Sequence, residues 1–287
     1  MAFLKPSPGS VPDTAALQAR LASFGSAAVA FSGGVDSAFL LSVAHDALGS
    51  RVLAVTVRTA TFPERETAET VAFCRAAGIR HAVVDFDVFA VPGFSENPDD
   101  RCYRCKRGFL DVVCRVAAEH GCAAVLEGSN ADDEAADRPG FRAVRERGVL
   151  SPLREAGFGK EQIRTAARAR GLSCWDKPSY ACLATRFPFG EKLTREKITR
   201  VAAAEETLAA RGFRQVRVRS HGDLARIAVA EEEMEKLFAA RAEIAAALLP
   251  CGFSFVTLDL RGYRSGDMNA TRMNTESEEG QQDGTIL

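Results

Sequence analysis

Three cysteines lie in polar stretches of the sequence, where another molecule can reach a thiol. Cys102 and Cys105 form a CxxC pair in DDRCYRCK, and Cys182 lies in KPSYACLATRFPFG, where prolines and a glycine prevent a long helix. Thiolate is the reactive form of cysteine, and the nearby Lys177 and Arg186 favour a positive field around Cys182. Two thiols at CxxC spacing can hold one metal ion or a cluster. The pattern predicts sulfur or metal chemistry, with ordinary loop cysteines as the alternative.

A glycine-containing hexapeptide, SGGVDS, is the second candidate site. It follows the apolar run AAVAF and precedes AFLLSVAHDALG, whose apolar spacing is helical, so it is the turn between a strand and a helix. Glycines allow a close approach to an anion, and the helix N-terminus attracts it. An aspartate there would repel phosphate unless a cation bridges the two, which implies Mg²⁺. The predicted nucleotide-binding residues are Ser32, Gly33, Gly34, Asp36 and Ser37, with an ordinary strand–helix turn as the alternative; no GxxxxGK[ST] Walker sequence occurs.

A third polar stretch, EGSNADDEAADRPG, follows another apolar run. Gly128 comes directly after that run, where close approach to a nucleotide is expected. Asn130 and Asp133 follow it, and they could hold Mg²⁺ or an adenylate, or cap a helix. We therefore include Gly128, Asn130 and Asp133 among the candidate nucleotide-binding residues.

Two arginines alternate along a predicted strand in VRVRSH. Arg217 and Arg219 are two positions apart, so they share a strand face, and paired guanidiniums suit a phosphate group. A solvated strand face is the alternative. Glu205, on a predicted helix, either faces the same site or lies on the helix surface.

Strand-like and helical segments alternate along the first half of the chain, which indicates an α/β fold with a doubly wound parallel sheet. Ligands of such sheets bind at the carboxyl ends of the strands, where SGGVDS lies. After residue 190 the pattern changes to that of a smaller α+β domain. The predicted strands of the sheet are 27–31, 51–57, 81–89 and 123–128, and the predicted parts of the chain are a nucleotide domain at 1–185, an α+β substrate or oligomerisation domain at 186–270 and a disordered tail at 271–287.

Composition narrows the class of protein. The net charge of −1 over 287 residues gives no basic field for nucleic acid. The start of the sequence, MAFLKPSPGSVPD, has no apolar run typical of a signal peptide or membrane span, so we expect a cytoplasmic protein with no membrane partner. In a reducing compartment the 8 cysteines are expected to be packed, metal-binding or catalytic. Those expected to serve packing alone are Cys74, Cys114, Cys122, Cys174 and Cys251.

SGGVDS resembles the PP-loop of the ATP pyrophosphatase families, whose fold is adenine nucleotide alpha hydrolase-like. Those enzymes cleave ATP between the α- and β-phosphates and attach AMP to an oxygen of the substrate. With ENPDDRCYRCK, EGSNADDEAADRPG, WDKPSYACLATRFPFG and RVRSHGDLARI, the sequence is similar to the LarE family from about residue 10 to about residue 270. That family contains ATP-dependent sulfur transferases that build the nickel-pincer nucleotide cofactor.

The resemblance implies a reaction and roles for residues. The substrate would be pyridinium-3,5-biscarboxylic acid mononucleotide, a carboxylate of which is adenylated with release of pyrophosphate. The sulfur-donating cysteine of the family falls on Cys182, which would form a thioester and end as dehydroalanine. Lys106 would lie near substrate or nucleotide, and Arg217 and Arg219 would bind the substrate phosphate. A homo-oligomer is also implied, with a hexamer as the candidate assembly.

The CxxC pair sets this chain apart from single-cysteine members of the family. Cys102, Cys105 and Cys182 would match the three-cysteine members, in which a [4Fe–4S] cluster with one open iron binds external sulfide. Sacrificial and cluster-dependent transfer therefore both stay open. Two other functions also stay open: another adenylating PP-loop enzyme, such as an amide synthetase or tRNA thiolase, and a non-catalytic nucleotide-binding protein. Pyrophosphate release in the presence of substrate separates the enzymes from the binding protein.

Overall fold

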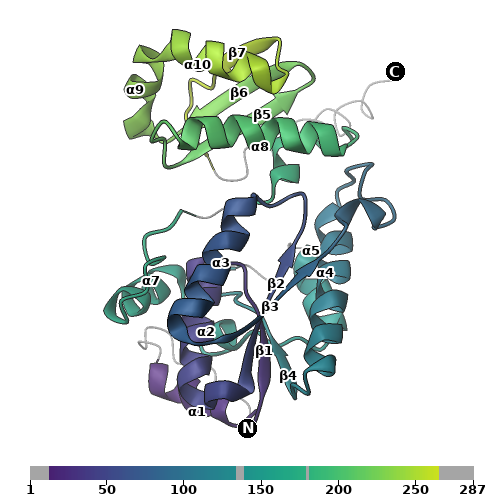
Figure 1. Ribbon diagram of the computed structural model, residues 1–287, viewed down its shortest axis with the longest axis vertical. Helices are drawn as coiled ribbons and strands as arrows, with labels where there is room; N and C mark the ends of the chain where they lie inside the picture. Colours follow the sequence, from purple (N-terminus) through teal and green to yellow (C-terminus); the bar gives the residue numbers. More distant parts are fainter. Residues whose placement is uncertain (1–12, 134–138, 179–180, 265–287) are drawn as a thin grey trace, which may run out of the picture. The chain divides into compact units, whose positions relative to one another are not determined.

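The computed structural model describes residues 13–133, 139–178 and 181–264, which form two compact units (Figure 1). Within the described residues, the first unit comprises 13–92, 100–133 and 139–178, and the second comprises 93–99 and 181–264. The domain assignments 1–185 and 186–270 stay predictions, and the predicted tail at 271–287 lies outside the described residues. Across the described ranges, no helix combines the length and the apolar character needed to cross a membrane.

Parallel strands form the centre of the first unit. In its described part four strands pair in the order β3-β2-β1-β4, all parallel. Their bounds are β1 Ala27–Ala30, β2 Val52–Arg58, β3 Arg80–Asp85 and β4 Ala124–Leu126. The third strand ends before the predicted position 89, because the side chain of Asp87 accepts a hydrogen bond from Phe89 N and starts the short 3-10 turn Val88–Ala90.

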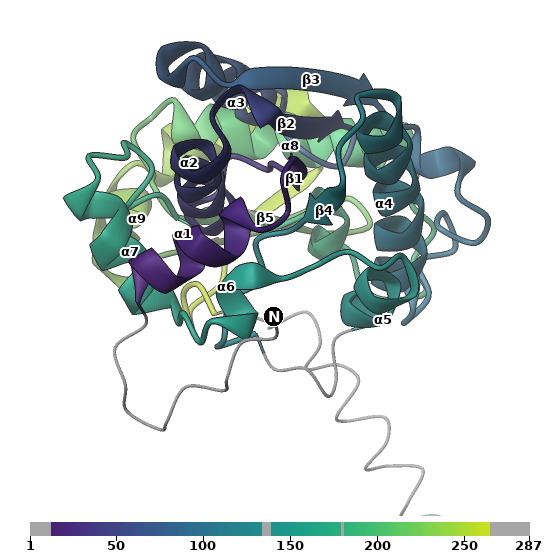
Figure 2. The same ribbon diagram turned by 90° about the horizontal axis from the view of Figure 1, so that it is seen from below.

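Helices cover both faces of this sheet, which confirms the doubly wound α/β fold (Figure 2). Alternate residues of β1 enter different cores: Val29 packs with the helices of one face, and Ala28 packs against Val113 and Val116 on the other. The first face carries α1 Thr14–Ala22, α2 Val35–Leu48, α3 Glu64–Ala77 and α7 Lys160–Ala169. The second face carries α4 Arg101–Glu119, onto which α5 Pro139–Glu146 packs; the short α6 spans Pro152–Glu155.

The second unit contains a small mixed sheet, as the predicted α+β pattern requires. Its described strands are β5 Val216–His221, β6 Leu224–Val229 and β7 Phe255–Leu258; β5 and β6 are antiparallel, and β6 and β7 are parallel. The helices are α8 Arg195–Ala209, α9 Met234–Ala239 and α10 Arg241–Leu248. The segment 231–250 is helical, with a break at Ala240 between α9 and α10.

Candidate active site

The SGGVDS turn forms as predicted, between β1 and α2. Gly33 has a φ of 75°, and a Cβ added there would lie 3.0 Å from Thr70 Cγ2, so both the backbone conformation and the space favour glycine. Ser37 Oγ donates to Gly34 O at 3.1 Å and accepts from Ser32 N at 3.3 Å. These hydrogen bonds brace the loop at the N-terminus of α2, where the helix dipole favours an anion.

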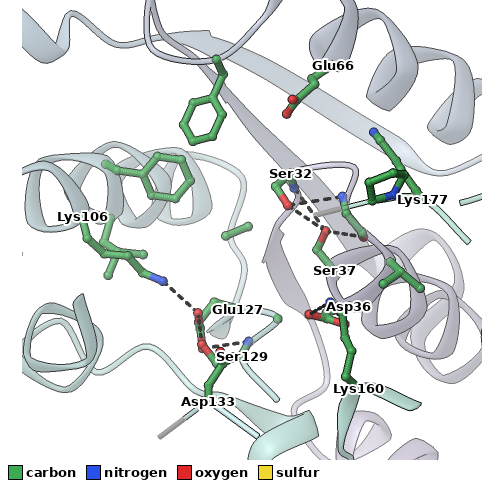
Figure 3. A pocket seen from close by; sticks show the side chains of 18 residues that line it. Ser32, Asp36, Ser37, Glu66, Lys106, Glu127, Ser129, Asp133, Lys160 and Lys177 are labelled. Atoms are coloured by element: carbon green, nitrogen blue, oxygen red, sulfur yellow. Dashed lines mark hydrogen bonds and ion pairs between the residues drawn. The ribbon is translucent and has the colours of Figure 1, made fainter. Parts of the chain in front are cut away.

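A pocket of about 300 Å³ opens beside this turn, at the carboxyl ends of β1 and β4 (Figure 3). Its volume is within the range of small-molecule sites, and its position is the one expected for a ligand of a doubly wound sheet. Polar groups come from the turn, α3, α4, the end of β4 and the segment 160–178. The polar and charged lining residues are Ser32, Asp36, Ser37, Glu66, Lys106, Glu127, Ser129, Asp133, Lys160 and Lys177.

Lys106 projects into the pocket from α4 and is held by a buried carboxylate. Its Nζ lies 3.0 Å from Glu127 Oε2, which also accepts from Ser129 Oγ at 2.8 Å. Glu127 Oε1 accepts from Ser151 Oγ at 2.5 Å and Ser129 N at 3.2 Å. Burial raises the pKa of Glu127, but Lys106 and the serine hydroxyls outweigh it, and the net pKa is lowered. Glu127 is therefore ionised at neutral pH and fixes the position of Lys106.

Two more lysines reach the SGGVDS turn from the segment 160–178. Lys160 Nζ donates to both oxygens of Asp36, at 2.9 and 2.8 Å. Lys177 Nζ donates to Gly33 O at 3.4 Å and pairs with Glu69. Among the described residues three lysines therefore line this pocket, a concentration of ammonium groups suited to a polyphosphate.

The third predicted stretch also meets the turn. A Cβ at Gly128 would lie 2.9 Å from Ser37 N, a backbone atom, so glycine allows β4 to end against the start of α2. Asn130 Nδ2 donates to Asp36 Oδ2 at 3.1 Å, and Asp133 Oδ2 accepts from Asn130 N at 3.1 Å. The structure brings Gly128, Asn130 and Asp133 to the turn, and their binding of Mg²⁺ or adenylate stays a prediction.

The CxxC cysteines lie on a helix rather than in a loop. The helix α4 begins at Arg101, and Asp100 at its N-terminus accepts from Arg104 Nε at 2.8 Å. Cys102 is exposed and Cys105 is half-buried, and a spacing of three places both thiols on one side of the helix. The first unit thus presents two neighbouring thiols.

Cys182 belongs to the second unit and is half-buried. It precedes the 3-10 turn Leu183–Arg186, and its carbonyl accepts from Thr185 N at 2.9 Å and Thr185 Oγ1 at 2.7 Å. These bonds fix the backbone around the thiol. The predicted meeting of Cys182 with Cys102 and Cys105, and hence a three-thiol metal site, stays a prediction.

Three arginines predicted at the site are buried in the second unit. Arg186 is 3% exposed and forms an ion pair with Glu205. Arg217 stacks over Tyr263 with Cζ 5.2 Å from the ring centroid, and Arg219 Nη1 lies 3.5 Å from Asp259 Oδ2. The solvated strand face considered for Arg217 and Arg219, and the helix surface considered for Glu205, are wrong because all three residues are buried. Phosphate binding by the two arginines stays a prediction.

Lys160 is one of the polar pocket residues absent from the sequence candidates, with Glu66, Glu127 and Ser129. It lies 124 positions from Asp36, in the sequence FGKEQ, where it is the first residue of α7. No motif marks such a lysine, because its role depends on a tertiary contact. Lys177 was singled out only for its nearness to Cys182 in sequence, and the structure shows that it contacts Gly33 O.

Comparisons with known proteins agree with this geometry. A family model described as asparagine synthase matches residues 14–136, which carry SGGVDS, the CxxC pair and the first ten residues of the third polar stretch. One chain of the glutamine-hydrolyzing GMP synthase of Archaeoglobus fulgidus is 28% identical over 158 residues, which is 52% of this chain and 52% of that protein.

Two other relatives extend over most of the chain. An uncharacterized protein of Synechocystis sp. is 40% identical over 245 residues, covering 85% of this chain and 91% of that protein. The pyridinium-3,5-bisthiocarboxylic acid mononucleotide synthase of Lactiplantibacillus plantarum is 38% identical over 244 residues, covering 85% of this chain and 88% of that enzyme.

Proposed function

Because this chain belongs to the LarE family of ATP-dependent sulfur transferases, we propose that it converts a carboxylate of pyridinium-3,5-biscarboxylic acid mononucleotide to a thiocarboxylate. The observation that carries the proposal is the pocket beside β1 and β4, which three lysines of the described chain line together with the SGGVDS turn. This arrangement suits the cleavage of ATP that adenylates a carboxylate.

The first step forms an acyl-adenylate. An oxygen of the substrate carboxylate attacks the α-phosphorus of ATP, and the bond to the oxygen bridging the β-phosphorus breaks, so pyrophosphate leaves. Lys106, Lys160 and Lys177 offset the charge that develops on the leaving group. The hydroxyl groups of Ser32 and Ser37 add hydrogen-bond donors on the same side of the pocket.

Mg²⁺ fits the chemistry of this pocket, since hard cations prefer oxygen ligands and the carboxylates of Asp36, Glu66 and Asp133 line it. Asp36, at the turn, would hold the ion. Bound Mg²⁺ would neutralise phosphate charge. Glu127 is less suited, because both of its oxygens already accept two hydrogen bonds each.

The second step moves sulfur. The Cys182 thiolate attacks the carbonyl carbon of the acyl-adenylate, AMP leaves, and a thioester forms. Loss of the Cα proton of Cys182 and cleavage of its Cβ–S bond then release the thiocarboxylate and leave dehydroalanine. A nucleophile on this route must be reachable, and Cys182 is half-buried, unlike the buried Cys74.

The second version of the transfer keeps the protein intact. Cys102, Cys105 and Cys182 would hold a [4Fe–4S] cluster, and the neighbouring thiols of α4 fit two of its ligands. The cluster would supply an open iron for external sulfide. The cytoplasmic location and the homo-oligomer, with a hexamer as its candidate form, also stay predictions.

Protein purified without oxygen tests the proposal. Iron and sulfide are measured first, and intact protein mass and product mass are measured after turnover with ATP, Mg²⁺ and substrate. Loss of the mass of H₂S at Cys182 would identify sacrificial transfer. Iron with sulfide, an unchanged protein mass and repeated turnover with added sulfide would identify the cluster route. Absence of thiocarboxylate under both conditions would contradict the proposed function.

A further inference from the structure

The ammonium group of Lys160 contacts the Asp36 carboxylate in the wall of the pocket. Its Nζ lies 2.9 Å from Oδ1 and 2.8 Å from Oδ2, so both carboxylate oxygens face one cation (Figure 3). The side chains are 29% and 19% exposed, so the pair lies in the pocket wall and not at its outer surface. Asn130 Nδ2 donates to Oδ2 as well, which keeps the carboxylate turned toward Lys160.

The backbone of Lys160 is anchored while its side chain is long. Lys160 N donates to Asp132 Oδ2 at 2.6 Å, so the first turn of α7 is tied to the stretch that also supplies Asn130. The ammonium stands on a flexible four-carbon stem and can change partners without movement of the backbone. Lys106 differs, because its carboxylate partner Glu127 is fixed by Ser129 and Ser151.

An ammonium ion that contacts both oxygens of a carboxylate disfavours the binding of a divalent cation to the same oxygens, because the two positive charges repel each other. Mg²⁺ binds oxygen at about 2.0–2.1 Å, and a lysine left in place would meet it as a like charge at contact distance. The phosphates of ATP alter the competition between Lys160 and a divalent cation for Asp36, since they offer Lys160 a second anionic partner in the same pocket.

We propose that Lys160 couples metal binding to nucleotide binding, a step that rests on the proposed function of this pocket. Without nucleotide, Lys160 neutralises Asp36 and weakens the binding of divalent cations there. When ATP and the cation enter together, the ammonium moves to a phosphate oxygen and Asp36 becomes a metal ligand. Lys160 thus disfavours metal binding at Asp36 before ATP arrives.

Binding of Mn²⁺ to the full chain, followed by the electron paramagnetic resonance signal of free Mn²⁺, tests this coupling. Wild type should bind Mn²⁺ at the pocket weakly without nucleotide and more tightly with α,β-methylene-ATP, after allowance for the Mn²⁺ that the nucleotide binds by itself. Lys160→Met should bind Mn²⁺ without nucleotide about tenfold more tightly than wild type, a change that corresponds to about 1.4 kcal/mol. Lys160→Arg keeps the charge and should match wild type, and adding Asp36→Asn to Lys160→Met should remove the gain.

Two results would overturn the proposal: equal nucleotide-free affinity in wild type and a folded Lys160→Met protein, or a gain that survives Asp36→Asn. Lys160→Gln serves the same comparison if the methionine variant does not fold. Thiocarboxylate formation by the wild type, measured separately, distinguishes the two claims. If product forms without the Mn²⁺ effect, the coupling alone fails; if the Mn²⁺ effect occurs without product, the proposed function fails and the coupling stands.

Discussion

Arg186 and Glu205 form a two-point ion pair inside the second unit. Arg186 Nε lies 2.6 Å from Glu205 Oε1, Nη2 lies 3.2 Å from Oε2, and the side chains are 3% and 7% exposed. Glu205 Oε1 also accepts from Val218 N at 2.9 Å, which ties the helix α8 to the strand β5. Arg186 therefore stabilises the segment that follows Cys182, whatever further part it takes in catalysis.

Removing one member of the Arg186–Glu205 pair should destabilise the folded protein. We expect Arg186→Met to lower the free energy of unfolding by about 3–5 kcal/mol, because Glu205 is left as a buried, uncompensated charge. Urea unfolding followed by circular dichroism measures the change. Arg115→Met is the matched control, since Arg115 is 56% exposed and its pair with Glu119 should contribute less than about 1 kcal/mol. Equal effects of the two substitutions would contradict this account.

The glycine that ends β4 should be needed for nucleotide use. Gly128→Ala places a Cβ 2.9 Å from Ser37 N and 3.0 Å from Ser37 Cα, so the SGGVDS turn must shift. We expect substrate-dependent pyrophosphate release to fall by about tenfold or more, since a small misplacement of binding groups weakens transition-state stabilisation strongly. Gly140→Ala is the control, because its Cβ would meet Lys106 Cδ at an ordinary 3.7 Å. Unchanged pyrophosphate release by Gly128→Ala would contradict the need for close contact between Gly128 and Ser37.

Glu127 should contribute to stability in a pH-dependent way. Its pKa is lowered from 4.5 in the folded chain, so its ionised form stabilises the protein above that value, and this contribution is lost as pH falls through the folded pKa. Glu127→Gln should destabilise the protein by about 1–3 kcal/mol at pH 7 and by progressively less below pH 4.5. Urea midpoints across the pH range measure the difference. Glu119→Gln, at an exposed position, should show little effect at any pH; a Glu127→Gln effect that grows toward acid pH would have the wrong sign.

The cysteines should differ sharply in reactivity. Burial raises the pKa of Cys74 to about 12, so at pH 8 almost none of it is thiolate, whereas Cys102 is exposed. We expect iodoacetamide to modify Cys102 in the folded apoprotein within minutes and to leave Cys74 unmodified, as mapped by peptide mass. In urea both should react, which controls for detection. If Cys74 in the native protein were modified as fast as Cys102, the burial of Cys74 in the core would be contradicted.

Local sequence determined the parts of the fold that depend on neighbouring residues. The apolar run at 27–31 and the helical spacing after SGGVDS predicted β1 and α2 because strand and helix periodicities are local properties. The resemblance added the family, which the relatives confirm. The break between α9 and α10 has no local signal, because neither glycine nor proline lies at Ala240.

The contacts of the site that the sequence did not predict join residues far apart in the chain. Lys160 meets Asp36 across 124 positions, and Ser151 meets Glu127 across 24, so no spacing within a motif could pair them. The sequence also did not reveal that Arg217 and Arg219 are buried. Alternating arginines are typical of a solvated strand face, and only the contacts with Tyr263 and Asp259 show otherwise.

The most direct test of adenylation followed by sulfur transfer compares wild type with Cys182→Ser, measuring pyrophosphate and thiocarboxylate in the same reaction. Wild type with ATP, Mg²⁺ and pyridinium-3,5-biscarboxylic acid mononucleotide should give both products. Cys182→Ser should still release pyrophosphate, because the pocket of the first unit is intact, but should form no thiocarboxylate. Thiocarboxylate from Cys182→Ser at the wild-type yield, or no substrate-dependent pyrophosphate from wild type, would contradict the account.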